Sequence, residues 1–223
     1  MVAPQLALDL ALEPDYRPES FCVSEANASA LASLYRWPRW RQGHLLLTGP
    51  KASGKTHMSR VWVERANPLE LDKSSLTQSL SDVGRGTSVL VEDIDQDLDE
   101  NGLFHLINRA SGDAGVTVLM TATGHVDDWG LGLDDLVSRL KAAETATLLE
   151  PDDALLRQVM EKLFKDRRTP VSEGVIEYLL MRMERSIDFA RVLTTWLDRE
   201  ALARKGPVTR PLAREALNAL SGD

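Results

Sequence analysis

The sequence predicts an α/β protein built on a five-stranded parallel sheet and followed by a small all-helical domain. Short apolar runs alternate with helix-like segments between residues 21 and 150, as in folds whose helices cover both faces of a parallel sheet. After Pro151 the strand signal stops and the apolar residues keep a helical period. A glycine-rich stretch also stands directly between a predicted strand and a predicted helix.

The α/β part is expected to begin with a helix that starts near Ser24 and ends before Pro38, because Leu31, Leu34 and Tyr35 recur at helical spacing. Short apolar runs bounded by turn residues then predict the strands, and amphipathic segments between them predict the helices. The expected strands are 45–48, 69–71, 88–91, 116–121 and 145–149, and the expected helices are 55–66, 74–80, 102–110 and 134–142.

The two ends of the chain are expected to differ from this α/β part. Residues 151–223 predict helices that together form a lid domain, since their apolar residues cannot be buried by strands. Residues 1–20 carry Pro4, Pro14 and Pro18 and are therefore expected to form an extended arm.

The composition excludes several classes of protein. A formal charge of −8 over 223 residues argues against a large sequence-independent DNA-binding face. Cys22 is the only cysteine, so one chain can hold neither a disulfide nor a cysteine-based zinc site, which favours a reducing cytoplasm. The N-terminal run is a poor signal peptide, and no apolar stretch reaches the length of a membrane span.

The glycine-rich stretch matches the phosphate-binding loop motif at every fixed position. Its glycines allow backbone N–H groups to surround phosphate oxygens, and the following helix adds the partial positive charge of its N-terminus. Lys55 is expected to reach the outer phosphates and Thr56 to ligate Mg²⁺. An incidental glycine turn is the alternative. The predicted nucleotide contacts are Gly49, Pro50, Lys51, Ala52, Ser53, Gly54, Lys55 and Thr56, with His57 following them.

A phosphate-binding loop needs acidic partners at the end of another strand, and Glu92 and Asp93 follow the run 88–91. We expect Glu92 to face the metal ion and Asp93 to orient water; a solvated strand end is the alternative. The further acids up to Asp99 do not form a calcium loop, because Leu98 stands where glycine is required, and we interpret them as a solvated loop.

Basic and aromatic residues alternate over residues 36–41, with Trp37 and Trp40 among them. Such a pattern can stack on the bases of single-stranded nucleic acid. A helix end interrupted by proline, with partly buried tryptophans, explains it equally well.

Several motifs, in order, resemble the AAA+ module of the replication initiator DnaA: Gly54-Lys55-Thr56-His57-Met58, Val91-Glu92-Asp93-Ile94, Leu103-Phe104-His105-Leu106-Ile107-Asn108 and Leu136-Val137-Ser138-Arg139-Leu140. The resemblance runs from about residue 21 to residue 220. It implies a P-loop AAA+ domain with a helical lid. The initiator's basic helix-turn-helix domain and its N-terminal oligomerisation domain have no counterpart in this sequence.

The arm contains Gln5-Leu6-Ala7-Leu8-Asp9-Leu10, which is similar to the peptide by which replication proteins dock on the sliding clamp. Together with the DnaA-like body, it resembles the Hda family (HdaA in alphaproteobacteria), the DnaA-related AAA+ proteins of regulatory inactivation of DnaA. The resemblance implies a negative regulator that binds the β subunit of DNA polymerase III through Gln5, Leu6, Leu8 and Leu10. It would then stimulate ATP hydrolysis by DnaA and meet DNA only indirectly, through the clamp.

The same resemblance assigns two arginines. Arg139 matches the arginine finger that acts on a partner's nucleotide, although by itself it reads equally well as an exposed helix arginine. Arg191 matches the sensor 2 arginine that reaches back to the bound nucleotide, and Thr121 or Thr123 falls at the sensor 1 position. ADP or ATP with Mg²⁺ is the implied cofactor.

Two departures from the DnaA pattern argue for weak turnover by the chain itself. Glu92 stands where aspartate is expected, and the segment around Thr121 lacks the initiator's polar pattern. Two further readings remain open: a self-contained ATPase of the helicase-loader type, and a DNA-anchoring protein that uses residues 36–41. Formation of homo-oligomers is left open as well.

Overall fold

The computed structural model describes residues 21–221, so the arm with Gln5, Leu6, Leu8 and Leu10 lies outside the described residues. The predicted five-stranded parallel sheet followed by helices is confirmed. The strands are β1 (His44–Thr48), β2 (Leu69–Glu70), β3 (Ser88–Val91), β4 (Thr117–Ala122) and β5 (Glu144–Thr147). Their order in the sheet is β2-β3-β4-β1-β5, and every pairing is parallel.

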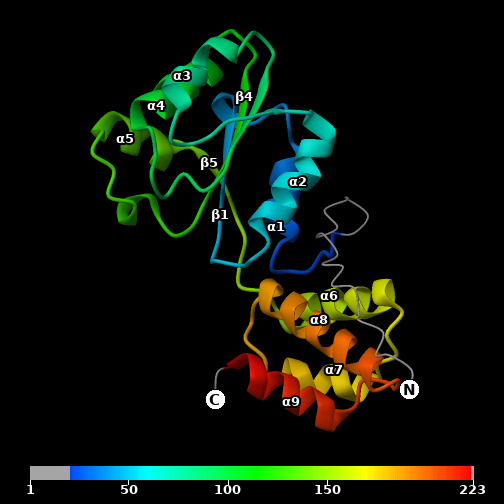
Figure 1. Cartoon of the computed structure of the whole chain (residues 1–223). Coiled ribbons are helices and arrows are strands. Elements are labelled where there is room, and N and C mark those ends of the chain that lie inside the picture. The colour runs from blue at the N-terminus through cyan, green and yellow to red at the C-terminus, as the bar shows by residue number, and fades with distance from the viewer. Residues whose placement is uncertain (1–20, 222–223) are drawn as a thin grey trace, which may run out of the picture.

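Helices cover both faces of the sheet (Figure 1). On one face lie α1 (Ala28–Tyr35) and α2 (Lys55–Ala66), and on the other lie α3 (Leu76–Ser79), α4 (Glu100–Ala110) and α5 (Asp134–Ala142). Successive side chains of a strand point to opposite faces. Leu45 and Leu47 of β1 accordingly pack in the core beneath α1 and α2, whereas Leu46 packs in the core beneath α4 and α5.

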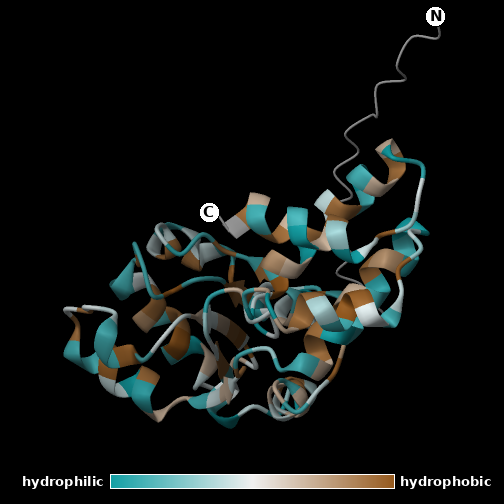
Figure 2. Ribbon diagram, turned by 90° about the horizontal axis from the view of Figure 1, so that it is seen from below, coloured by the Kyte–Doolittle hydropathy of each residue, from teal (hydrophilic) through white to brown (hydrophobic). Residues whose placement is uncertain are grey.

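The C-terminal helices are α6 (Asp153–Arg167), α7 (Glu173–Leu180), α8 (Ile187–Ala203) and α9 (Arg210–Ser221). They enclose a core of their own, in which Leu156, Met160, Leu179 and Leu193 are fully buried. Figure 2 shows hydrophobic and hydrophilic residues alternating along these ribbons, as expected for amphipathic helices.

The first helix starts later than predicted. Ser24 does not cap α1, which begins at Ala28 with Asn27 at its N-cap position. The buried Asn27 side chain accepts a hydrogen bond from Ser24 N at 3.0 Å and donates one to Cys22 O at 2.9 Å. These bonds hold residues 22–27 in a turn, which delays the helix by about one turn.

The aromatic residues between α1 and β1 are part of the core. Trp40 is 4% exposed, and the ring of Trp62 lies 5.4 Å from that of Trp40 and 6.3 Å from that of Trp37. The indole N–H of Trp37 also donates to Thr117 Oγ1 at 3.0 Å. The structural interpretation of these tryptophans therefore holds, because packed rings cannot stack on bases.

Among residues 21–221, every helix is too short or too polar to span a lipid bilayer.

Candidate nucleotide-binding site

The loop from Gly49 to Thr56 joins the carboxyl end of β1 to the start of α2, as the motif predicts. Both of its glycines are required by geometry. Gly54 has φ +99°, which other residues rarely adopt, and it occupies the N-cap position of α2. A Cβ atom on Gly49 would lie 2.8 Å from Leu148 Cβ and 2.9 Å from Ser53 Oγ. Only glycine fits at these two positions.

The polar groups of the loop fit a phosphate chain. The Nζ atom of Lys55 donates to Gly49 O at 3.0 Å and to Pro50 O at 2.8 Å, which keeps the ammonium group inside the curl of the loop. Ser53 Oγ is buried and has no hydrogen-bond partner among the described residues. A ligand with several oxygen acceptors would satisfy both groups, together with the N-terminus of α2.

Burial lowers the pKa of Lys55, while the negative charges of Asp93 and Asp95 act in the opposite direction. The ammonium form is thus disfavoured by desolvation and supported by two carboxylates. Phosphate oxygens placed beside Nζ would add to that support, so the amine is positioned to gain from binding an anion.

The loop borders a cavity of about 550 Å³. Four other parts of the chain line it: the segment after β2, the segment after β3, the residue after β4, and the start of α8. Residues of all five parts contribute, namely Lys51, Ala52, Gly54, Lys55, Thr56 and His57 with Lys73, Asp93, Asp95, Gln96, Thr123, Ile187, Asp188 and Arg191.

The helical domain closes one side of this cavity. The backbone N–H of Ile187, the first residue of α8, donates to Ala52 O of the loop at 3.4 Å. One turn further along the helix, Arg191 lines the cavity and its Nη1 lies 3.6 Å from Asp188 Oδ1. A guanidinium at this place can contact phosphate oxygens held by the loop, so the position fits the role that the resemblance implies.

We expect Arg191→Ala to weaken the binding of ADP and ATP by about 10- to 100-fold, because one charge-assisted hydrogen bond is worth roughly 1.5–3 kcal/mol. Calorimetric titration of the purified protein measures the effect. Arg185→Ala is the matched control, since Arg185 pairs with Asp153 and does not line the cavity. Equal affinities for the two variants would remove Arg191 from the site.

Hydrogen bonds made by its backbone hold Asp93 in place. Its φ is +54°, its N–H donates to Thr121 Oγ1 at 2.9 Å, and its carbonyl accepts from Lys73 Nζ at 2.8 Å. Thr121 is buried and acts on this backbone, whereas Thr123 lines the cavity. The Asp93 carboxylate is thereby presented to the cavity, where a water-orienting group would be needed.

Glu92 and Thr56 were predicted to bind Mg²⁺ together, but only Thr56 lines the cavity. The carboxylate of Glu92 accepts a hydrogen bond from Ser59 Oγ at 2.8 Å and lies 3.6 Å from Arg60 Nη2, both on α2. Burial raises the pKa of Glu92, and the contacts with Ser59 and Arg60 oppose this rise. A role in binding Mg²⁺ beside Thr56 would require the carboxylate to leave these partners.

The sequence interpretation missed five residues that line the cavity, namely Lys73, Asp95, Gln96, Ile187 and Asp188. Asp95 lies in the acidic stretch that we interpreted as solvated, yet it lines the cavity and accepts from Thr123 N at 3.1 Å. Lys73 and Gln96 come from segments without a motif. The only available signal was the position of Asp95 two residues beyond Asp93, at the carboxyl end of a parallel strand.

The segment before α1 also reaches the site. The ring of Phe21 packs edge-on against His57 with 5.1 Å between centroids, and Cys22 packs against the core of the helical domain. Further along, Ala26 N donates to Asp152 Oδ2 at 3.3 Å, and Asp152 caps α6. Residues 21–26 thus connect the loop helix to the helical domain.

Arg139 lies apart from this cavity. It is exposed in the last turn of α5, and its Cζ lies 5.0 Å above the ring of Phe104 on α4. It is absent from the residues that line the cavity beside Lys55. Its guanidinium is therefore available on the surface rather than directed at the chain's own loop.

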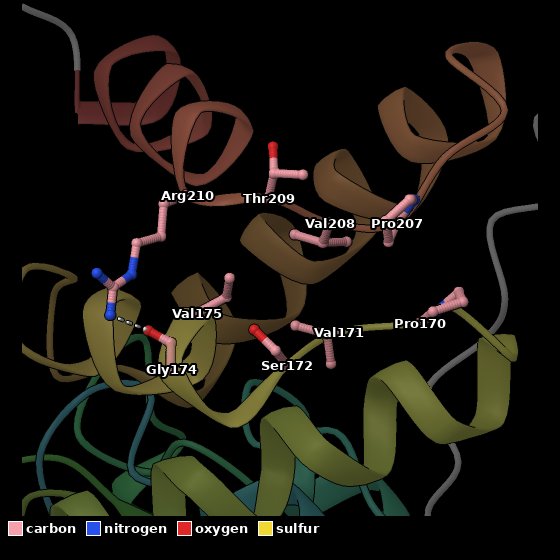
Figure 3. Close-up of a pocket in the computed structure, with 9 residues that line it drawn as sticks. All are labelled: Pro170, Val171, Ser172, Gly174, Val175, Pro207, Val208, Thr209 and Arg210. Atoms are coloured by element: carbon pink, nitrogen blue, oxygen red, sulfur yellow. Dashed lines mark hydrogen bonds between the residues drawn. The ribbon is translucent and has the colours of Figure 1, made fainter.

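A hollow of about 620 Å³ lies within the helical domain, between the segments 170–175 and 207–210 (Figure 3). Val171 and Val208 form a single parallel bridge at its floor. Arg210 is its one charged lining residue, and Arg210 Nη2 bonds Gly174 O at 3.5 Å. The open, mostly apolar surface offers nothing comparable to the phosphate-binding groups beside Lys55.

Comparison with known proteins places this geometry in a recognised fold. No model of a known protein family matches the chain. The structure is similar to domain III of the replication initiation protein DnaA from Thermotoga maritima, with a TM-score of 0.76 and 19% identity, covering 92% of this chain and 97% of that one. It is also similar to the Holliday junction branch migration motor RuvB of Thermotoga maritima (TM-score 0.68, 18% identity, 87% and 67% covered).

A third similar structure is AMPPCP-bound DnaA from Aquifex aeolicus, with a TM-score of 0.67, 17% identity, and 87% and 70% of the two chains covered. At these identities the likeness concerns the fold alone. The chain therefore has the P-loop AAA+ fold, with a helical C-terminal region that corresponds to a lid.

Proposed function

We propose that the chain is a negative regulator of replication initiation of the Hda type, acting in the cytoplasm. Its arm docks on the β sliding clamp through Gln5, Leu6, Leu8 and Leu10, and its body stimulates ATP hydrolysis by DnaA. This role brings the chain to DNA through the clamp. The DnaA-like fold supports a place in replication, since structures of DnaA are among those that resemble it.

The placement of Arg139 carries the proposal. Arg139 is exposed on α5, lies over the ring of Phe104 and does not line the chain's own cavity. Supplied across an interface, its guanidinium would neutralise charge that develops on the phosphoryl group of the partner's ATP. The reaction would then take place in the nucleotide site of DnaA.

The chain's own site serves as a structural switch in this proposal. Lys55, Ser53 and the loop N–H groups hold the phosphates of ADP or ATP, and Arg191 fastens the lid to them. A Mg²⁺ ion beside Thr56 would supply charge neutralisation of the outer phosphates. Asp93 is positioned to orient water, but Glu92 is engaged by Ser59 and Arg60, which favours weak turnover.

Hydrolysis measured in a reconstituted reaction tests the proposal. ATP-bound DnaA is mixed with the clamp loaded on DNA, with and without this protein, and release of phosphate is followed. Faster hydrolysis that depends on both the clamp and this protein is expected. The proposal fails if the rate equals that of DnaA with the loaded clamp alone.

The arm has a separate prediction. Gln5→Ala combined with Leu6→Ala should abolish clamp binding in a pull-down, because both the polar anchor and one apolar anchor are lost. Binding of ADP should stay unchanged, since neither residue belongs to the loop. A control variant with Ala3→Ser and Val2→Ala keeps the anchors and should bind like the wild type. Clamp binding by the double alanine variant would remove the motif from the argument.

The self-contained ATPase is favoured by one observation, the presentation of Asp93 to the cavity. Steady turnover by the purified protein alone, lost in Lys55→Ala, would support that alternative. Resident ADP with negligible turnover would support the regulator.

A further inference from the structure

The surface at the end of α1 and α2 carries an unusual concentration of positive charge for an acidic protein. Arg36, Arg39 and Arg41 are exposed in the turn that leads into β1, and Arg65 is exposed in the last turn of α2. Tyr35, the last residue of α1, is 50% exposed beside them. We call these five residues the arginine patch. The whole chain carries a net charge of −8, so the patch is positive in a protein that is negative overall.

Packed tryptophan rings support the turn that carries the patch. The packed rings of Trp37, Trp40 and Trp62 hold the turn against the core, and Trp40 Nε1 donates to Ser33 O at 3.0 Å. Because Trp37 and Trp40 point inward, the arginines that alternate with them point outward. The basic-aromatic pattern in the sequence thus separates into a buried aromatic base and an exposed cationic surface.

The arginines differ in their partners. Arg36 is paired with Glu144, whose second oxygen accepts from the backbone N–H of Arg41 at 2.9 Å. The guanidinium of Arg65 lies 5.8 Å from the ring centroid of Tyr35 and 5.9 Å from that of Trp37. Within residues 21–221, the side chains of Arg39, Arg41 and Arg65 make no ion pair. Three guanidinium groups therefore retain their donors for a ligand.

We propose that the arginine patch binds the phosphodiester backbone of DNA directly. The guanidinium fork matches phosphate oxygens, and a group held over an aromatic ring loses less conformational freedom on binding. The exposed ring of Tyr35 adds a stacking surface for a base or sugar, which an acidic protein partner would not use. The patch lies apart from the nucleotide cavity, and the inference is independent of the proposed function. Direct contact with DNA would add to the indirect contact through the clamp.

Titration of fluorescein-labelled 30-nucleotide DNA over a series of salt concentrations tests the inference on the full chain without the clamp. Three phosphate contacts predict a slope of log K against log salt of about −2.7 for duplex and about −2.1 for single strands. Duplex affinity should then fall about 40-fold between 50 and 200 mM salt. Arg39→Ala with Arg41→Ala should reduce that fall to about 3.5-fold.

The matched control is Lys205→Ala with Arg214→Ala, which removes the same charge from exposed positions of the helical domain. It should keep the slope of the wild type. Tyr35→Ala distinguishes single-stranded DNA from duplex DNA as the ligand. If single-stranded DNA is the ligand, the affinity for single strands alone should fall about fivefold or more, and Tyr35→Phe should restore it. An equal, small effect on both DNA forms identifies duplex.

Equal slopes for the wild type and the Arg39/Arg41 variant would overturn the inference, as would equal losses in the control. Binding of polyglutamate with no binding of DNA would overturn it too, because the patch would then serve an acidic protein. Thermal unfolding of each variant shows whether it is folded, and the exposed positions of Arg39 and Arg41 predict unchanged midpoints.

Discussion

Replacing Arg139 with alanine should abolish the stimulation of ATP hydrolysis by DnaA, while nucleotide binding and clamp binding stay intact. Arginines supplied across an interface accelerate phosphoryl transfer by about 10³ to 10⁵ in comparable systems, because they neutralise charge at the transition state. Arg139 is exposed and lies over the ring of Phe104, and among residues 21–221 no hydrogen bond of its side chain to the core would be lost. The rate of phosphate release from ATP-bound DnaA with the loaded clamp measures the effect.

Lys141→Ala is the matched control for that experiment. Lys141 lies half a turn further along α5, where it pairs with Asp127. The substitution removes the same charge from the same helix, and the variant should retain most of the stimulation. Stimulation retained by Arg139→Ala would reject the finger assignment, and equal losses in both variants would point to general electrostatics of this surface.

Lys55→Ala should weaken the binding of ATP and ADP by at least about 100-fold. The Nζ atom is placed inside the loop, and two charge-assisted bonds to phosphate oxygens are worth roughly 3 kcal/mol or more. At a ligand concentration about 100 times its dissociation constant, the wild type gains roughly 2.7 kcal/mol of stability. That gain raises the unfolding midpoint by about 5–10 °C in a protein of this size, and the variant should lose the rise.

Lys51→Ala controls for the loss of a lysine from the same loop. Lys51 is exposed, and its contribution to the motif is its backbone N–H, which alanine retains. Its nucleotide affinity should therefore stay within a few-fold of the wild type. If Lys55→Ala kept its midpoint shift with ADP, the loop would not be the phosphate site.

The local parts of the site were predictable because their chemistry depends on neighbours in sequence. Gly54 of the loop, Lys55 at the start of α2 and Asp93 after β3 all follow from short-range patterns, and the structure places them around one cavity. Arg191 was found through the resemblance alone, since its own helix pattern would read it as an ordinary surface charge.

The position of other side chains depended on packing between distant segments. Asp95 faces the cavity because it accepts a hydrogen bond from Thr123, 28 residues away. Glu92 turns toward Ser59 and Arg60 because α2 passes beside the end of β3. Neither set of partners could be identified from the residues around Asp95 or Glu92, because the partners lie on segments distant in sequence.

Periodicity and glycine placement are local properties of the chain, so they were enough to predict the α/β class, the helical C-terminal region and the phosphate-binding loop. Tertiary packing set the order of the sheet, in which β4 lies between β1 and β3 although β2 lies between them in the chain. It also decided that Trp37 and Trp40 face the core while Arg39 and Arg41 face solvent. A pattern records whether a residue prefers burial, but only long-range packing selects the surface that buries it.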